Sequence, residues 1–184
     1  MLSRRQTWLM ISTIGIGEMH VKLGGGKLSG TNKVVVFTIG NEEYAVPIEN
    51  VLSIEKVEGI TPIPHLPNYV RGIIKVRGEL IPALDTENIL YNRSTNIGEA
   101  VRIIVLRTAD MSLGILVNEA KEILDIPTEL IKQVGLVAYQ KTSYFTGVAN
   151  LDSRLVTIVD PSILVKSLEG IREIQAYMQK QLQE

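Results

Sequence analysis

VRGIIKVRGELIPALD (Val70–Asp85) is the stretch that decides the fold, because the chain returns to the same pattern in FTGVANLDSRLVTIVD (Phe145–Asp160). The two stretches align without gaps at an offset of 75 residues, from Gly72 to Gly147, and both end in aspartate. The matched apolar pairs are Ile73 with Val148, Val76 with Leu151, Leu80 with Leu155, Ile81 with Val156 and Leu84 with Val159. Each stretch has two apolar runs around a short polar turn, which is the pattern of a β-hairpin.

A second match lies upstream of each hairpin. YAVPIENVLSI (Tyr44–Ile54) is similar to LGILVNEAKEI (Leu113–Ile123) at an offset of 69 residues, from Tyr44 to Leu113. Two matches in the same order and at similar offsets predict one β unit of about 70 residues that is used twice. The sequence therefore predicts two small β lobes; the alternative is that apolar strands match by chance.

The rest of the chain beyond Val34 has many short β-type runs, which favour a barrel or a sandwich over a parallel α/β sheet. Thr61–Pro67 has three prolines and is expected to run extended or turned, and Ile126–Ile131 is expected to form a short helical turn. The predicted strands are Val34–Ile39, Glu43–Ile48, Gly72–Val76, Glu79–Leu84, Val101–Arg107, Leu113–Val117, Gly147–Leu151 and Leu155–Val159.

A helix is predicted at the end of the chain, over residues 161–184 with its tail. Asp160 is a suitable N-cap and Pro161 a suitable first helical residue, while Gly170 weakens the middle of the helix by roughly 1 kcal/mol. We expect its apolar stripe to pack on a lobe; the alternative is a helix that binds a partner. The stripe contains Leu164, Leu168, Ile171, Ile174 or Gln175, and Met178.

The composition leaves few reagents for catalysis. The 184 residues include 2 His and no Cys, which excludes disulfides, cysteine-zinc sites and thiol nucleophiles, and we expect no cofactor and no metal. An enzyme would have to pair carboxylates, and each of the candidates lies at a strand end or turn, where capping residues are common. These candidates are Asp85, Asp125, Asp152 and Asp160.

The charge is unevenly distributed along the chain. Residues 1–33 carry five basic residues and one acidic residue, whereas the rest has 14 basic and 19 acidic residues. We expect a disordered basic extension over residues 1–32, in which Gly24–Lys27 belongs to a flexible linker. Its longest uncharged run, Gln6–Gly17, is too short to span a bilayer, so no direct membrane insertion is expected.

The acidic body argues against a nucleic-acid-binding barrel, which would show a basic face with aromatic stacking residues.

The body, from about Lys33 to Ser167, resembles the CheW family, the coupling adaptors of bacterial chemosensory arrays. The motifs occur in the family's order: VFTIGNEEYAVPIENVLSIEKV, PIPHLPNYVRGIIKVRGELIPALD, RIIVL, LGILVNEAKEIL and GVANLDSRLVTIVD. The resemblance implies a mainly β fold of two intertwined SH3-like five-stranded barrels over residues 33–168, followed by the C-terminal helix. It also implies a cytoplasmic, non-catalytic adaptor, recruited to membrane-associated receptor arrays.

The partners implied by the resemblance are the regulatory domain of a CheA-type histidine kinase and the cytoplasmic tip of chemoreceptors. The pathway could control flagella, pili or another output. Three residues depart from the usual family pattern: Lys75 replaces Asn in the Lys-Val-Arg-Gly motif, as CheV proteins also can, Ser53 replaces Glu, and Asn118 replaces Asp. These departures bear on the choice of partner more than on the fold.

Arg77 is the first candidate for binding a partner, because Arg77-Gly78 lies between two apolar strands and would present a guanidinium that can pair with carboxylates. The alternative is a structural salt bridge across the lobe junction. By resemblance, Gly72 and Gly78 maintain the backbone that places Arg77, and the strand Glu43–Ile48, with Val46, matches a region that docks the kinase. Apolar family positions around the receptor-facing groove correspond to Val51, Ile54, Ile103 and Ile104, some of which must be ordinary core.

Overall fold

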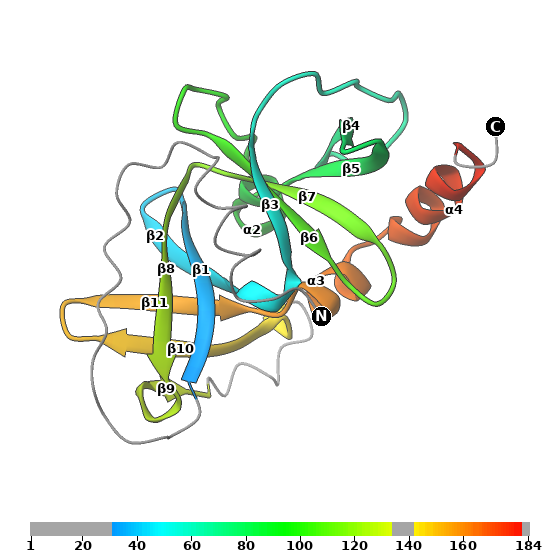
Figure 1. Ribbon diagram of the computed structural model, residues 1–184. Helices are drawn as coiled ribbons and strands as arrows, with labels where there is room; N and C mark the ends of the chain where they lie inside the picture. The colour runs from blue at the N-terminus through cyan, green and yellow to red at the C-terminus, as the bar shows by residue number, and fades with distance from the viewer. Residues whose placement is uncertain (1–30, 134–141, 182–184) are drawn as a thin grey trace.

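The computed structural model describes residues 31–133 and 142–181, and within them it contains two β-sheets that wrap into small barrels (Figure 1). The first barrel is a six-stranded sheet in the order β8-β1-β2-β11-β10-β9, and the second is a five-stranded sheet in the order β3-β6-β7-β5-β4. The first barrel consists of β1 (Thr31–Ile39), β2 (Glu42–Pro47), β8 (Glu119–Pro127), β9 (Ile131–Lys132), β10 (Phe145–Leu151) and β11 (Arg154–Val159). The second consists of β3 (Val51–Lys56), β4 (Val70–Val76), β5 (Glu79–Asp85), β6 (Arg102–Arg107) and β7 (Ser112–Val117).

The chain crosses between the barrels more than once. It passes from β2 to β3 through the short helix η1 (Ile48–Asn50), and it passes from β7 to β8 at Asn118. Each barrel therefore contains strands of both sequence repeats, so a repeat is not itself a lobe. This confirms the intertwined double barrel, with one difference in strand number: the two-residue strand β9 makes the first sheet six-stranded rather than five-stranded.

The two sequence repeats are equivalent in three dimensions. The hairpin β4–β5 and the hairpin β10–β11 have the same register at the 75-residue offset, including a bulge at the same point, between Val70 and Gly72 and between Phe145 and Gly147. Strand β5 pairs in parallel with β7, as β11 pairs in parallel with β2. Chance matching of apolar strands does not produce such agreement. The equivalent pairs are Ile74↔Ile81 with Ala149↔Val156, Ala83↔Gly114 with Ile158↔Ala45, and Val105↔Gly114 with Val36↔Ala45.

The core has three parts because the barrel walls are apolar on both faces. A small cluster fills each barrel, with Val36 and Val156 in the first and Ile81 and Leu116 in the second. The largest cluster lies between the barrels and includes Phe37 and Leu106. Every predicted strand coincides with an observed one, and η2 (Thr128–Leu130) is the predicted helical turn.

The predicted C-terminal helix is confirmed, but the structure divides it into two helices. The structure has α3 (Pro161–Ser167) and α4 (Ile171–Gln181), separated at Gly170, which adopts a left-handed φ of +82°. The side-chain oxygen of Asp160 accepts hydrogen bonds from the backbone of Ser162 and Ile163, so the predicted N-cap is confirmed. The apolar stripe packs on the barrels as expected, with Leu164, Ile171, Ile174 and Met178 buried.

The six-residue helix α2 (Thr86–Tyr91) follows β5 and was not predicted. Among the helices of the described residues, none is long and apolar enough to cross a membrane. The predicted extension over residues 1–32 and its glycine-rich linker lie almost entirely outside the described residues.

Candidate protein-binding site

The tip of the β4–β5 hairpin presents Arg77 to solvent. Val76 pairs with Glu79, so Arg77 and Gly78 form a two-residue turn, and their φ values of +51° and +87° are those of a type I′ turn. Arg77 is exposed, as is Lys75 on β4. The turn thus projects positive charge from an acidic body, as predicted.

The equivalent hairpin tip of the first barrel is held differently. At the 75-residue offset, Arg154 of the first barrel corresponds to Glu79 of the second. The Arg154 guanidinium lies 2.9 Å from the carboxylate of Glu43 and 2.6 Å from that of Glu122, and Glu43 also pairs with Lys121. Arg77 forms no ion pair with any residue in the described ranges. Within the described residues, Arg77 therefore lacks the internal salt bridge that was the alternative for it, and its contact with a partner stays a prediction.

Gly72 lies on β4 where another segment of backbone approaches. Thr61 and Ile73 exchange two backbone hydrogen bonds of 2.9 and 2.8 Å, which attach the proline-rich segment to the edge of β4. A Cβ on Gly72 would lie 2.1 Å from the carbonyl oxygen of Thr61, and the φ of Gly72 is +144°. Gly72 is buried, so its position in the structure supports the hairpin rather than a direct contact.

The apolar residues that family resemblance places around a binding groove lie mostly in the core. Ile103 and Ile104 are 1% and 0% exposed, and Ile54 is buried. Val51 is half-buried and packs against the central cluster. Val46 is buried on β2, which has β1 on one side and β11 on the other, so that strand cannot accept an additional strand. A contact of these residues with a partner stays a prediction.

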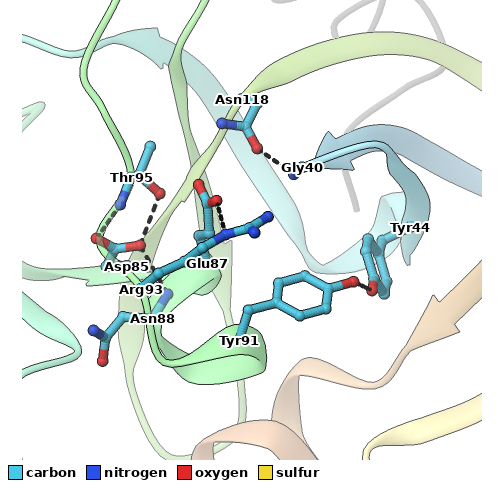
Figure 2. A network of polar contacts seen from close by, with 9 residues as sticks. All are labelled: Gly40, Tyr44, Asp85, Glu87, Asn88, Tyr91, Arg93, Thr95 and Asn118. Carbon is cyan, nitrogen blue, oxygen red and sulfur yellow. Dashed lines mark hydrogen bonds and ion pairs between the residues drawn. The ribbon is translucent and has the colours of Figure 1, made fainter.

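Asp85, at the end of β5, holds α2 and the segment after it in place (Figure 2). Its carboxylate is fully buried and accepts hydrogen bonds from the backbone N–H of Asn88 (3.1 Å), the backbone N–H of Thr95 (2.9 Å) and the hydroxyl of Thr95 (2.8 Å). The Arg71 guanidinium lies 3.6 Å away. Asp85 therefore caps α2 and fixes the segment that follows it. Of the other carboxylates considered for catalysis, Asp160 caps α3, and Asp125 and Asp152 are exposed.

Helix α2 is attached to the first barrel by a contact between one of its own side chains and a side chain of β2. The hydroxyls of Tyr91 and Tyr44 are hydrogen-bonded to one another, and burial, together with that bond, raises the pKa of Tyr44. The Arg93 guanidinium lies 5.2 Å from the centre of the Tyr91 ring and 2.5 Å from the carboxylate of Glu87. Figure 2 shows these groups between α2 and the β1–β2 turn.

We expect Tyr91→Phe to cost about 1–2 kcal/mol of unfolding free energy, because it leaves the buried Tyr44 hydroxyl without its partner. Tyr44→Phe should cost less, since Tyr91 is partly exposed and can bond to water. The double variant should be no less stable than Tyr91→Phe alone. Urea denaturation of the four proteins measures this cycle, and additive losses would show that the two hydroxyls do not interact.

Asn118 lies where the chain crosses from the second barrel to the first, although the sequence suggested that it bears on partner choice. Its side-chain oxygen accepts a 2.6 Å hydrogen bond from Gly40 N–H, and its backbone N–H donates to Thr38 O (2.9 Å). Asn118 thus fixes the β1–β2 turn to the β7–β8 crossing. The sequence did not point to Tyr91, Arg93 or Glu87. The available signal was the run of polar residues that directly follows the end of a predicted strand near Asp85.

Within residues 31–133 and 142–181, no three His, Asp or Glu side chains are grouped so that they could hold a metal ion. The strand exchange between the sheets defines the class of the protein as an intertwined double barrel, here with a projecting basic hairpin. A family model described as a CheW-like domain matches residues 33–169. The chain belongs to the CheW family, whose members are chemotaxis adaptor proteins, and this confirms the resemblance of its motifs.

Individual relatives agree with the family match. The chemotaxis protein CheW of Klebsiella aerogenes is 29% identical over 147 residues, which is 78% of this chain and 89% of that protein. That of Helicobacter pylori is 31% identical over 130 residues, which is 71% of this chain and 79% of that protein. The crystal structure of the scaffolding protein TtCheW from Thermoanaerobacter tengcongensis superposes with a TM-score of 0.67 at 26% identity, covering 78% of this chain and 94% of that one.

Proposed function

We propose that this protein is a non-catalytic scaffold that couples the cytoplasmic tip of chemoreceptors to the regulatory domain of a CheA-type histidine kinase. The family match supports the coupling role, and the hairpin tip supports a specific contact. The observation that carries the proposal is the exposed guanidinium of Arg77 on a tightly defined turn, without an ion-pair partner among the described residues. Such a turn fixes the backbone from which the Arg77 side chain projects. Less conformational entropy is therefore lost when the guanidinium binds a carboxylate.

The charge pattern around the hairpin fits an acidic partner surface. Lys75 and Arg77 are exposed beside Glu79, whereas the body as a whole is acidic. Complementary charge speeds association and selects the partner more than it adds affinity. Weak contacts of this kind become strong in an array, where many copies bind at once. The family match supports a protein that works in the cytoplasm and is recruited to receptors at the membrane.

Arg77→Glu should weaken assembly with the receptor fragment and kinase by at least about tenfold, because it places like charges together at a desolvated contact. The unfolding free energy should change by less than about 0.5 kcal/mol, since Arg77 is exposed. Co-sedimentation with receptor fragments measures assembly, and thermal unfolding measures stability.

Arg172→Glu is the matched control, because it makes the same charge change at an exposed position of α4. It should leave assembly unchanged. If Arg77→Glu lowers stability in proportion to assembly, Arg77 has a structural role; if it leaves assembly intact, the hairpin tip is not part of the binding site.

A further inference from the structure

One face of the first barrel carries large apolar side chains that are exposed to solvent. Leu130, in η2, is 40% exposed and Leu155, on β11, is 61% exposed. Leu155 pairs with Asn150 on β10, and Asn150 lines a shallow hollow together with Glu129, Leu130, Lys132 and Asp152. Because paired residues of neighbouring strands share a face, these side chains form one surface, which we call the Leu130–Leu155 face.

The equivalent face of the second barrel is covered by the chain itself. Leu80 occupies the position of Leu155 at the 75-residue offset, and it packs against the central core cluster. That cluster includes Ile171, Ile174 and Met178 of α4, which contacts β5. Gln175 of α4 also donates a 3.5 Å hydrogen bond to the backbone oxygen of Asp110. The C-terminal helix thus covers on one barrel the kind of face that is exposed on the other.

The other end of the described chain meets the exposed face. Strand β1 begins at Thr31, which pairs with Pro127, and the side-chain amide of Asn32 donates to the Thr128 hydroxyl at 3.4 Å. Thr128 and Leu130 both belong to η2. The thirty residues that precede β1 are therefore attached at the border of the Leu130–Leu155 face.

Those thirty residues have the composition that this face would bind. They contain Arg4, Arg5, Lys22 and Lys27 against Glu18, and their uncharged run includes Trp8, Leu9 and Ile11. The face offers two exposed leucines, and its hollow has two carboxylates, Glu129 and Asp152, against Lys132. Apolar contact and charge complementarity therefore both favour binding of this segment to the Leu130–Leu155 face.

We propose that residues 1–30 bind the Leu130–Leu155 face of the same molecule. A short tether gives an effective concentration on the order of millimolar, so even a weak interaction keeps the face occupied for much of the time. The two ends of the chain then have matching roles, since each covers one of the two equivalent barrel faces. A partner that uses the first barrel's face has to displace residues 1–30.

The native chain has no Cys, so an introduced thiol reports exposure at one position. Asn150→Cys places the probe on the face and keeps both leucines, and Ile97→Cys, at an exposed position between α2 and β6, is the control. The rate of thiol labelling is compared between the full chain and a chain beginning at Thr31. A third protein carries Arg4→Glu, Arg5→Glu and Trp8→Asp in the full chain, which tests the contact without shortening the protein.

We expect the thiol of Asn150→Cys to be labelled at least about twofold more slowly in the full chain than in the shortened chain, and as fast in the substituted chain as in the shortened one. Labelling of Ile97→Cys should be equal in all three proteins, and the slowing should be independent of protein concentration. Equal rates for Asn150→Cys in the full and shortened chains would overturn the proposal. So would slowing that grows with protein concentration, since the occupant would then come from a second copy.

Discussion

Gly72→Ala should lower the unfolding free energy by about 3–5 kcal/mol, through backbone strain and steric overlap together. The φ of +144° is a conformation that side-chain-bearing residues rarely adopt, and an added Cβ would lie 2.1 Å from the oxygen and 2.7 Å from the carbon of the Thr61 carbonyl. Because both of these atoms are backbone, the clash can be relieved only by moving the Thr61 segment away from Ile73. The two hydrogen bonds between these residues would then be lost. Urea denaturation measures the effect.

Two other glycines serve as controls. Gly78 has a φ of +87° but no atom within 4 Å of an added Cβ, so Gly78→Ala should cost only about 1 kcal/mol. Gly147 is the repeat equivalent of Gly72, and its nearest neighbour at 2.8 Å is a side-chain methyl group of Ile131, which can shift. We expect Gly147→Ala to be intermediate. A loss below about 1 kcal/mol at Gly72 would contradict the close approach of the two segments.

Asp85→Ala should be the second most damaging change, with a loss of about 3–4 kcal/mol. It removes the cap of α2 and leaves the N–H and hydroxyl of Thr95 without their acceptor in a buried place. It also leaves Arg71 without the carboxylate that lies 3.6 Å away. Unfolding in urea gives the size of the loss, and hydrogen exchange at the Thr95 amide shows whether the segment after α2 has loosened.

Asp160→Ala is the matched control, because Asp160 is the repeat equivalent and caps α3 at a half-buried position. It removes a cap without leaving a second segment unbonded, so a loss of about 1 kcal/mol is expected. Equal losses for the two variants would show that the contacts of Asp85 with Thr95 add nothing to capping.

The repeated pattern made the strands predictable from sequence, but not the barrel to which each strand belongs. Alternating apolar residues specify a strand and its faces, whereas β2 and β3 differ in barrel only because η1 turns the chain across the junction. Strands β3, β8 and β9 were not predicted. In β8, charged residues such as Lys121 and Asp125 interrupt the apolar pattern at the sheet edge. The break at Gly170 depends on a left-handed backbone conformation, which a regular apolar stripe does not reveal.

The candidate site, too, was predictable from sequence only in part. Arg77 at a hairpin tip follows from Arg-Gly between two strands, and the structure places it there. The alternation of side chains along a strand implied that only some of the apolar groove residues are core. Strand β6, however, has an apolar cluster on each face, so both of its candidates are core. Ile103 belongs to the interior of the second barrel and Ile104 to the core between the barrels. The role of Asp85 depends on Thr95, ten residues away, and no local pattern connects them.

Reconstitution of the ternary assembly tests the coupling role most directly. Receptor cytoplasmic fragments arrayed on vesicles are sedimented with a CheA-type kinase, with and without this protein. We predict that the kinase and this protein sediment together, and that removing this protein lowers the sedimented kinase at least about tenfold, as expected when multivalent contacts are lost. Kinase recovery that is the same with and without this protein, or failure of this protein to sediment with either partner, would contradict the account.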